Sequence, residues 1–156
     1  MKKLSLGLVA PLALAGAFAA GPVAAQDADL TIAESMPWFG FPFFVHMDNE
    51  IRAEAEALGV DLIVTDGENE AAKQSEDVAA AITQQVDGIL ISPIDSVAMA
   101  PASQEAVDAG VPVFTIDRRV EGVEILGHVG ADNVIGGEAQ GQLIIDTFPD
   151  GATIVN

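Results

Sequence analysis

An acid and two bases directly follow an apolar, β-branched run in the middle of the chain. The run is Val111–Ile116, and it is followed by Asp117, Arg118 and Arg119. Such a run, entered through a proline, is typical of a strand buried on both faces of a sheet. A carboxylate offers hydrogen-bond acceptors and a guanidinium a fixed fork of donors, which together suit a small polyhydroxylated molecule. We therefore expect Asp117 and Arg118 to form the polar half of a sugar-binding cleft, with Arg119 as an exposed neighbour.

Aromatic residues gather in one short segment. Within seven positions the chain has Trp38, Phe39, Phe41, Phe43 and Phe44. A hydrophobic core normally spreads its aromatic rings over several elements, whereas flat rings on one loop can bury the apolar C–H faces of a sugar. We interpret the cluster as a stacking surface; the alternative is that some of the rings close the top of the core.

Other polar candidates follow the apolar run Gly88–Ile91. Ser92 could reach a ligand hydroxyl. Asp95 could contribute to the same binding edge, but we favour the alternative that it caps the next helix. For Asp117 and Arg118 the alternative is an ordinary surface ion pair. An alternative function is that of an exported carbohydrate-active enzyme, in which Asp95 and Asp117 would be the pair of catalytic carboxylates. No nucleophile motif accompanies these two acids.

Composition excludes several functions. The formal net charge of −18 argues against nucleic acid as a partner, because few bases are present to neutralise phosphates. The absence of cysteine excludes zinc–thiolate sites, thiol nucleophiles and disulfides. His46 and His128 lack a third ligand at suitable spacing, and no phosphate-binding, dinucleotide-binding or hydrolase motif occurs. We expect neither a metal nor a cofactor.

The amino terminus has the pattern of an export signal. Lys2 and Lys3 precede an apolar stretch over residues 4–20, and small residues up to Ala25 form a cleavage site before Gln26. The alternative, a permanent membrane anchor, is weakened by the glycines and prolines of this stretch. We expect residues 1–25 to be a signal peptide, cleaved near Ala25, and the protein to be periplasmic.

Strand-like and helical patterns alternate through the rest of the chain. Predicted strands cover residues 29–34, 60–65, 88–92, 111–117 and 124–130, and a sixth begins at 152–155. Helices are predicted over about 42–58, 69–85, 96–109 and 134–148, the third either capped by Ser96 or beginning near Met99 because of Pro101. The alternation predicts an α/β fold with a doubly wound, mostly parallel sheet. In such sheets ligands bind beyond the carboxyl ends of the strands, where the candidate residues lie.

Several of these segments occur together in one known family. Phe41–Phe44, Ile91–Asp95, Val111–Arg118 and Gly130–Gly137 have the order and spacing seen in bacterial periplasmic sugar-binding proteins. Over nearly all of the chain after the signal segment, the sequence most resembles the ribose-binding type, the substrate-binding protein of a sugar ABC transporter. The resemblance implies two type I periplasmic-binding-protein lobes that close on a monosaccharide. It also implies delivery to a membrane permease and, in some members, to a chemoreceptor.

The resemblance also implies roles for individual residues. Phe43 and Phe44 match the pair that stacks on the sugar, and Asp117 and Arg118 match the pair that hydrogen-bonds its hydroxyls. Ser92 falls where the ribose type often has asparagine before proline.

Two loop positions and one hinge position complete the comparison. Phe41 replaces an asparagine that contacts the ligand in ribose binders, so we expect a different monosaccharide or a sugar alcohol. Trp38 is expected to extend the stacking surface, and Asp132 to lie near the first hinge crossing.

The resemblance divides the chain into unequal parts. It implies that residues 26–131 form most of the first lobe, and that residues 132–156 form a hinge crossing and only the start of the second lobe. The chain is thus expected to be truncated before most of that lobe. The same fold forms the effector domain of lactose-repressor-like transcription factors, but an export segment and a scarcity of bases exclude that alternative here. A sugar-like signal receptor without transport remains open.

Overall fold

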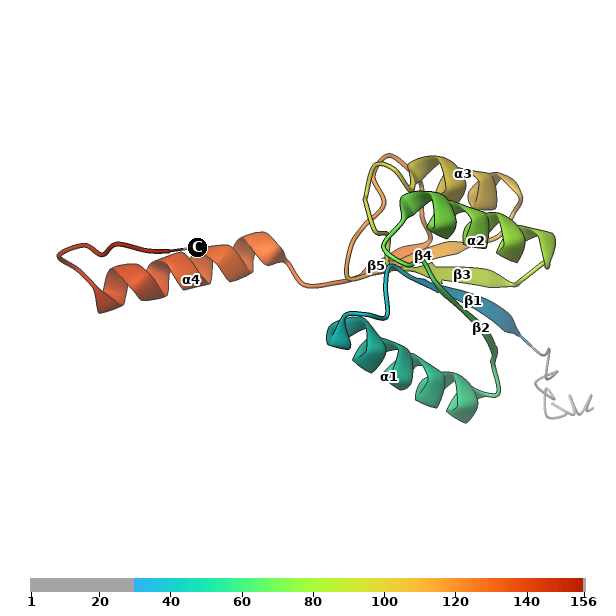
Figure 1. The fold of residues 1–156 in the computed structure, drawn as a ribbon, viewed down its shortest axis with the longest axis horizontal. Coiled ribbons are helices and arrows are strands. Elements are labelled where there is room, and N and C mark those ends of the chain that lie inside the picture. Colours follow the sequence, from blue (N-terminus) through green and yellow to red (C-terminus); the bar gives the residue numbers. More distant parts are fainter. Residues whose placement is uncertain (1–29, 156) are drawn as a thin grey trace, which may run out of the picture.

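Five parallel strands form the centre of the molecule (Figure 1). The computed structural model describes residues 30–155, so the predicted signal peptide lies outside the described residues. The strands are β1 (Thr31–Met36), β2 (Asp61–Asp66), β3 (Gly88–Ile91), β4 (Val113–Ile116) and β5 (Gly127–Val129). The helices are α1 (Pro42–Leu58), α2 (Ala71–Thr83), α3 (Ala100–Asp108) and α4 (Asn133–Thr147). The sheet order β2-β1-β3-β4-β5 confirms the predicted doubly wound α/β fold.

The core lies between one face of the sheet and two helices. Helices α2 and α3 cover this face side by side (Figure 1). Alternate side chains of each strand point into it, so Ile89 and Ile91 of β3 pack with Val113 of β4 against Val78 and Ala106 of the helices. This layer fixes the relative positions of β1, β3 and β4, whose carboxyl ends carry the predicted site.

The opposite face is only partly covered, which contradicts one prediction. A strand buried on both faces would bury Phe114, but this residue is 42% exposed. Its strand neighbours Val113 and Thr115 point toward the covered face, whereas Phe114 points to the side where α1 does not reach. An apolar hollow of about 360 Å³ is left there, lined in part by Ile32 and Leu90.

Helix ends follow the predicted signals in α1 and depart from them in α3. α1 begins at Pro42 and ends before Gly59, whose φ of 69° is the left-handed conformation common just past a helix. The predicted Ser96 cap is wrong. Asp95 instead accepts hydrogen bonds from the backbone N–H groups of Val97 (2.9 Å) and Ala98 (2.7 Å), closing a turn before α3. α3 therefore starts only at Ala100, close to the predicted alternative.

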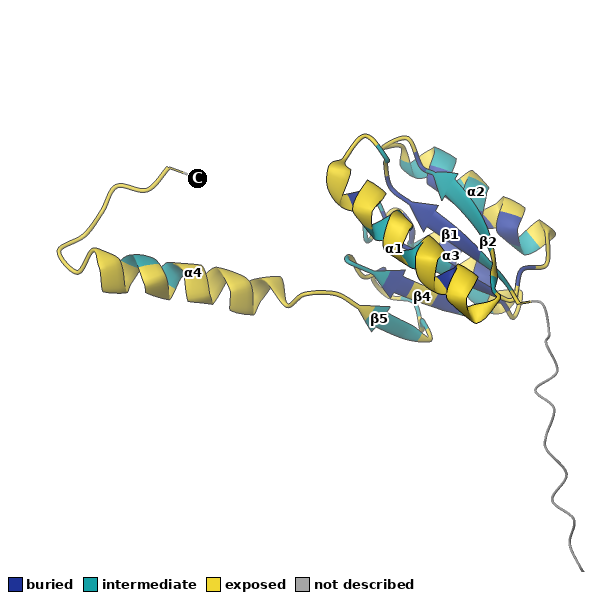
Figure 2. Cartoon of the chain, turned by 90° about the horizontal axis from the view of Figure 1, so that it is seen from below, coloured by how far each residue is buried: buried dark blue, intermediate teal, exposed yellow. Residues whose placement is uncertain are grey.

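The carboxyl-terminal segment extends away from the sheet. α4 is capped as predicted by Asp132, whose Oδ1 accepts from the N–H groups of Val134 (3.0 Å) and Ile135 (3.1 Å). No residue of α4 is buried (Figure 2). The predicted sixth strand is wrong: residues 152–155 form none, since they lie beyond α4 with no neighbouring strand to pair with. Among residues 30–155, no helix has the length and apolar character needed to cross a membrane.

Candidate functional site

The start of α1 places three phenylalanine rings at the carboxyl edge of the sheet. Phe41 precedes the helix in an extended conformation, and its carbonyl accepts from the N–H of Phe44 at 3.0 Å. The ring centroids of Phe43 and Phe44 are 5.2 Å apart in an edge-on arrangement, and those of Phe41 and Phe44 are 6.3 Å apart. Phe44 is only 6% exposed and anchors the group, while the other two rings face outward. We call these three residues the ring wall.

Arg118 meets the ring wall from the end of β4. The Cζ atom of its guanidinium lies 6.0 Å from the centroid of the Phe44 ring, within reach of a cation–π contact. Nη1 donates to the carbonyl of Ile94 at 2.9 Å and approaches that of Pro93 at 3.4 Å. Nε lies 3.7 Å from Oδ2 of Asp117. The structure thus brings the predicted cation, its acid neighbour and the aromatic cluster to one edge, as the sequence predicted.

The backbone turns sharply at Asp117. Its φ is 65°, in the left-handed region, and its N–H donates to the carbonyl of Val129 at 2.9 Å. Aspartate adopts this conformation more readily than most residues. The turn ends β4 and places Asp117 and Arg118 side by side at the carboxyl edge of the sheet.

Two hollows open on either side of the ring wall. The Arg118 hollow has a volume of about 260 Å³ and is lined by Pro37, Trp38, Phe41, Phe44, Asn69 and Arg118. The Asp117 hollow has a volume of about 360 Å³ and is lined by Phe43, Met47, Ile116, Asp117, Val129, Gly130 and Ala131. Arg118 and Asp117 therefore line different hollows, and the prediction of a single cleft lined by both side chains is wrong in this respect.

Trp38 lies directly over the backbone of Gly40. A Cβ added at Gly40 would come within 2.1 Å of Cε2 and Cζ2 of the Trp38 indole, so only glycine permits this close approach. The partly exposed indole closes the Arg118 hollow from the side of the loop that precedes α1. Trp38 is a predicted part of the stacking surface, and the structure places it with Phe41 and Arg118.

We expect Gly40→Ala to displace the Trp38 indole. Because Trp38 is the only tryptophan of the 156-residue chain, its fluorescence reports this movement alone. The emission maximum should shift by several nanometres, while the melting temperature changes little. Gly136→Ala on α4 is the matched control, since its added Cβ meets nothing within 4 Å beyond its chain neighbours and the backbone of its own helix. Identical spectra for both variants and the wild type would refute the close approach.

The three remaining predicted residues line neither hollow. Ser92 is fully buried, and its hydroxyl has no hydrogen-bond partner among the described residues. The prediction that Asp95 caps the next helix is wrong, because Asp95 closes the turn before α3 and α3 begins only at Ala100 without a side-chain cap. Hydrogen bonds from the N–H groups of Ala98 and Val97 lower the pKa of its carboxyl. Asp132 caps α4, as the helix pattern predicted.

Asn69 is a site residue that the sequence did not single out. It follows the Asp66–Gly67 turn at the end of β2, has a φ of 62°, and its N–H donates to the carbonyl of Pro37 at 2.9 Å. Oδ1 of Asp66 accepts from the N–H of Phe39 at 3.3 Å, so this turn holds the aromatic loop. The sequence feature that could have identified Asn69 is an asparagine in a turn that follows a strand ending at the binding edge.

Glu34 is a second residue without a signal in the sequence. It lies in β1, is 0% exposed, and neither carboxyl oxygen has a hydrogen-bond partner among the described residues. Burial, and to a smaller extent the charge of Asp48, raises its pKa to about 7, while Arg52 opposes the rise. Arg52 itself pairs with Asp48 at 2.8 Å on α1.

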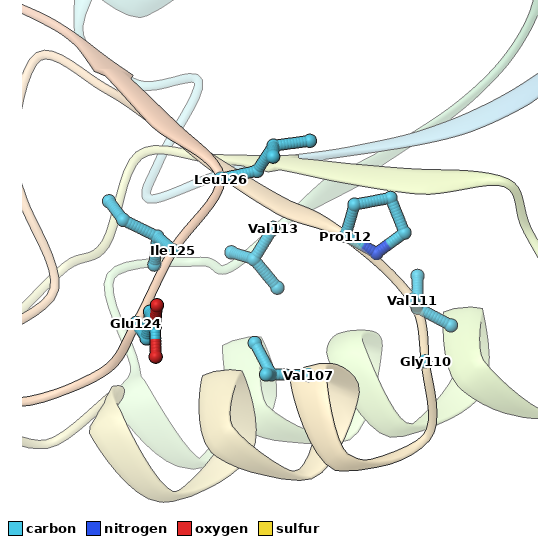
Figure 3. A pocket seen from close by; sticks show the side chains of 8 residues that line it. All are labelled: Val107, Gly110, Val111, Pro112, Val113, Glu124, Ile125 and Leu126. Carbon is cyan, nitrogen blue, oxygen red and sulfur yellow. The ribbon is translucent and has the colours of Figure 1, made fainter.

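A larger hollow lies elsewhere. It has a volume of about 460 Å³ and is built around the last turn of α3, the start of β4 and the segment before β5 (Figure 3). Val107 and Val113 point into it, Ile125 lies at its side, and Glu124 is its one charged lining residue. This is the amino end of β4 and β5, away from the edge where parallel sheets bind ligands. No group of three potential metal-ligating side chains occurs in residues 30–155.

Comparisons with known proteins show which family this chain resembles. A family model described as a periplasmic binding protein domain matches residues 32–156. The ribose import binding protein RbsB of Bacillus subtilis is 40% identical over 126 residues, which cover 81% of this chain and 41% of that protein. RbsB of Escherichia coli is 34% identical over 155 residues, which cover 99% of this chain and 51% of that protein.

A solved structure has a similar fold. The Caulobacter myo-inositol binding protein bound to myo-inositol matches with a TM-score of 0.77 and 38% identity, over 81% of this chain and 43% of that one. The chain thus spans about half the length, or less, of the relatives it matches.

Proposed function

This chain belongs to the periplasmic binding protein family, and we propose that its protein captures a monosaccharide or sugar alcohol in the periplasm and delivers it to an ABC-type importer. One observation carries the proposal: a guanidinium lies against an aromatic wall at the carboxyl edge of a parallel sheet. Relatives named as ribose and myo-inositol binding proteins support it. They are binding proteins, so we expect binding without turnover.

The ligand contacts follow from the chemistry of the edge. We propose that the ligand lies at the rim between the two hollows, where Nε of Arg118 and Oδ2 of Asp117 are 3.7 Å apart. There the ring wall would pack against its apolar C–H face, Arg118 would donate to its hydroxyl oxygens, and Asp117 would accept from its hydroxyls. Asn69 adds an amide to the Arg118 hollow. Ser92 remains a candidate only if the buried hydroxyl becomes accessible when ligand binds.

Phe41 bears on which ligand is chosen. It faces outward beside Phe44, so an apolar ring stands where a ribose binder is expected to have an amide. A hydroxyl directed at this ring would lose its hydrogen bond to water without a replacement, which selects strongly against that ligand. We therefore propose a sugar or polyol other than ribose.

A thermal-shift screen of the complete protein tests the function. The panel comprises D-ribose, L-arabinose, D-fructose, D-galactose, D-glucose, myo-inositol and glycerol. We expect one or two members to raise the melting temperature by several degrees, with no product formed on prolonged incubation. A flat response to the whole panel would contradict sugar binding, and product formation would favour the carbohydrate-active enzyme.

We also propose that the chain is the amino-terminal part of a two-lobe protein. Residues 26–131 would form most of the first lobe, and residues 132–156 the hinge crossing and the start of the second. Its coverage of relatives, the exposed apolar face at Phe114 and the absence of buried residues in α4 support this division. The missing portion would cover the exposed face and close over the ligand. The permease as partner and the cleaved signal peptide over residues 1–25 belong to the same proposal.

The 156-residue chain alone is expected to bind sugar weakly or not at all. A ligand held by one lobe keeps one side in water and lacks half of its hydrogen-bond partners. Isothermal titration of the chain with the best ligand of the complete protein should give no heat below millimolar concentration. Micromolar or tighter binding by the isolated chain would contradict the two-lobe proposal.

A further inference from the structure

Gln74 is a buried polar side chain beneath the binding edge. It lies on α2 and is 0% exposed. Its Nε2 donates to the carbonyl of Ser92 at 2.9 Å and approaches that of Ser35 at 3.4 Å. Its Oε1 accepts from the N–H of Ile94 at 2.9 Å. One amide therefore ties the carboxyl ends of β1 and β3 together.

The segment that Gln74 holds is the segment that holds Arg118. The N–H of Ile94 donates to Gln74, and the carbonyl of the same residue accepts from Nη1 of Arg118. Pro93 provides a second carbonyl to Nη1 at 3.4 Å. The side-chain amide, the backbone of residues 92–94 and the guanidinium thus form one continuous hydrogen-bonded chain.

We propose that Gln74 is a positioning residue, which acts on the ligand through Arg118 without touching it; this inference rests on the proposed sugar site. The guanidinium is a rigid fork, so its remaining donors point correctly only while the two backbone carbonyls stay in place. A side chain that cannot hydrogen-bond would leave the carbonyl of Ser92 and the N–H of Ile94 without partners in a buried place. The segment would then move to recover those bonds, and Arg118 would move with it.

Gln74→Met in the complete protein tests this. Methionine has a similar volume, so it removes the hydrogen bonds with little change in packing. We expect the affinity for the best sugar of the panel to fall at least tenfold at a temperature where circular dichroism shows the variant folded. Gln104→Met is the matched control, because Gln104 is an exposed glutamine on α3 whose side-chain amide donates to Asp108 of the same helix. If Gln74→Met does not fold, Gln74→Asn replaces it: the shorter amide is neutral but cannot reach both the carbonyl of Ser92 and the N–H of Ile94, so the same loss of affinity is expected.

Double mutants separate positioning from general destabilisation. Combined with Arg118→Lys, Gln74→Met should add less than a threefold further loss, because both act through the same guanidinium. Combined with Phe43→Leu in the Asp117 hollow, it should add its full effect. Equal losses in both backgrounds, or affinity unchanged by Gln74→Met, would overturn the inference.

A ligand-free measurement keeps the test independent of the proposed function. The Nε–Hε NMR resonance of Arg118, assigned by its loss in Arg118→Lys, should shift in Gln74→Met and not in Gln104→Met. An unchanged resonance would overturn the positioning role even if no sugar binds. A shifted resonance together with a flat sugar panel would uphold the link to Arg118 and reject the sugar site.

Discussion

Arg118→Ala is expected to abolish the rise in melting temperature that sugar gives the complete protein. The guanidinium is the one cation beside the ring wall among the residues lining the two hollows. Each hydrogen bond between a charged group and a ligand contributes about 1.5–3 kcal/mol, so losing two weakens binding about 100-fold or more. The melting temperature without ligand should fall only slightly, because the side chain is about half exposed.

The neighbouring arginine provides the control for this experiment. Arg119 is exposed and lines neither hollow, so Arg119→Ala removes the same charge from the next position. It should leave the ligand-induced shift intact. If Arg118→Ala keeps a normal shift, or if both variants lose it equally, the assignment of Arg118 to the site is wrong.

Glu34→Gln is expected to remove a large pH dependence of stability. The pKa of Glu34 is raised by burial from its ordinary value of 4.5 to about 7, so the folded state retains a proton that the unfolded state releases. The free energy of unfolding therefore falls as pH rises from about 4.5 to about 7, and the lost stability is not regained above that range. Between about pH 5 and pH 8 the loss is about 2–3 kcal/mol.

Urea unfolding at about pH 5 and pH 8 measures this effect. The wild type should lose stability over the interval, whereas Glu34→Gln, which cannot ionise, should lose that much less. Glu56→Gln is the matched control, because Glu56 is an exposed glutamate on α1. It should follow the wild type. Parallel curves for Glu34→Gln and the wild type would show that Glu34 does not titrate between these pH values.

Features with a local cause could be predicted from the sequence. The start of α1 at Pro42, its end at Gly59 and the Asp132 cap depend on residues within one helical turn. The order of strands and helices predicted a parallel sheet, and therefore which strand ends share an edge. For that reason the residue pattern alone was enough to assign Asp117, Arg118 and the ring wall to one place.

Contacts between distant segments could not be predicted. The exposure of Phe114 depends on how far α1 extends over the sheet. Residues 152–155 would form a strand only beside another strand with which they could pair, and the structure places none of the described strands there. Gln74 has the sequence pattern of one polar residue of a helix, and only packing against β1 and β3 makes it a buried link.

By itself, then, the sequence determined the α/β fold, the family and the chemical types that gather at the binding edge, because helix ends, strand periodicity and motifs act over a few residues. Only the tertiary structure decided that Asp117 and Arg118 line separate hollows and that Asn69 lines the Arg118 hollow. It also decided that Ser92 is buried in the protein interior. The physical reason is that these outcomes depend on loops from β1, β2, β3 and β4 packing together. Their mutual distances follow from long-range contacts that no short stretch of sequence encodes.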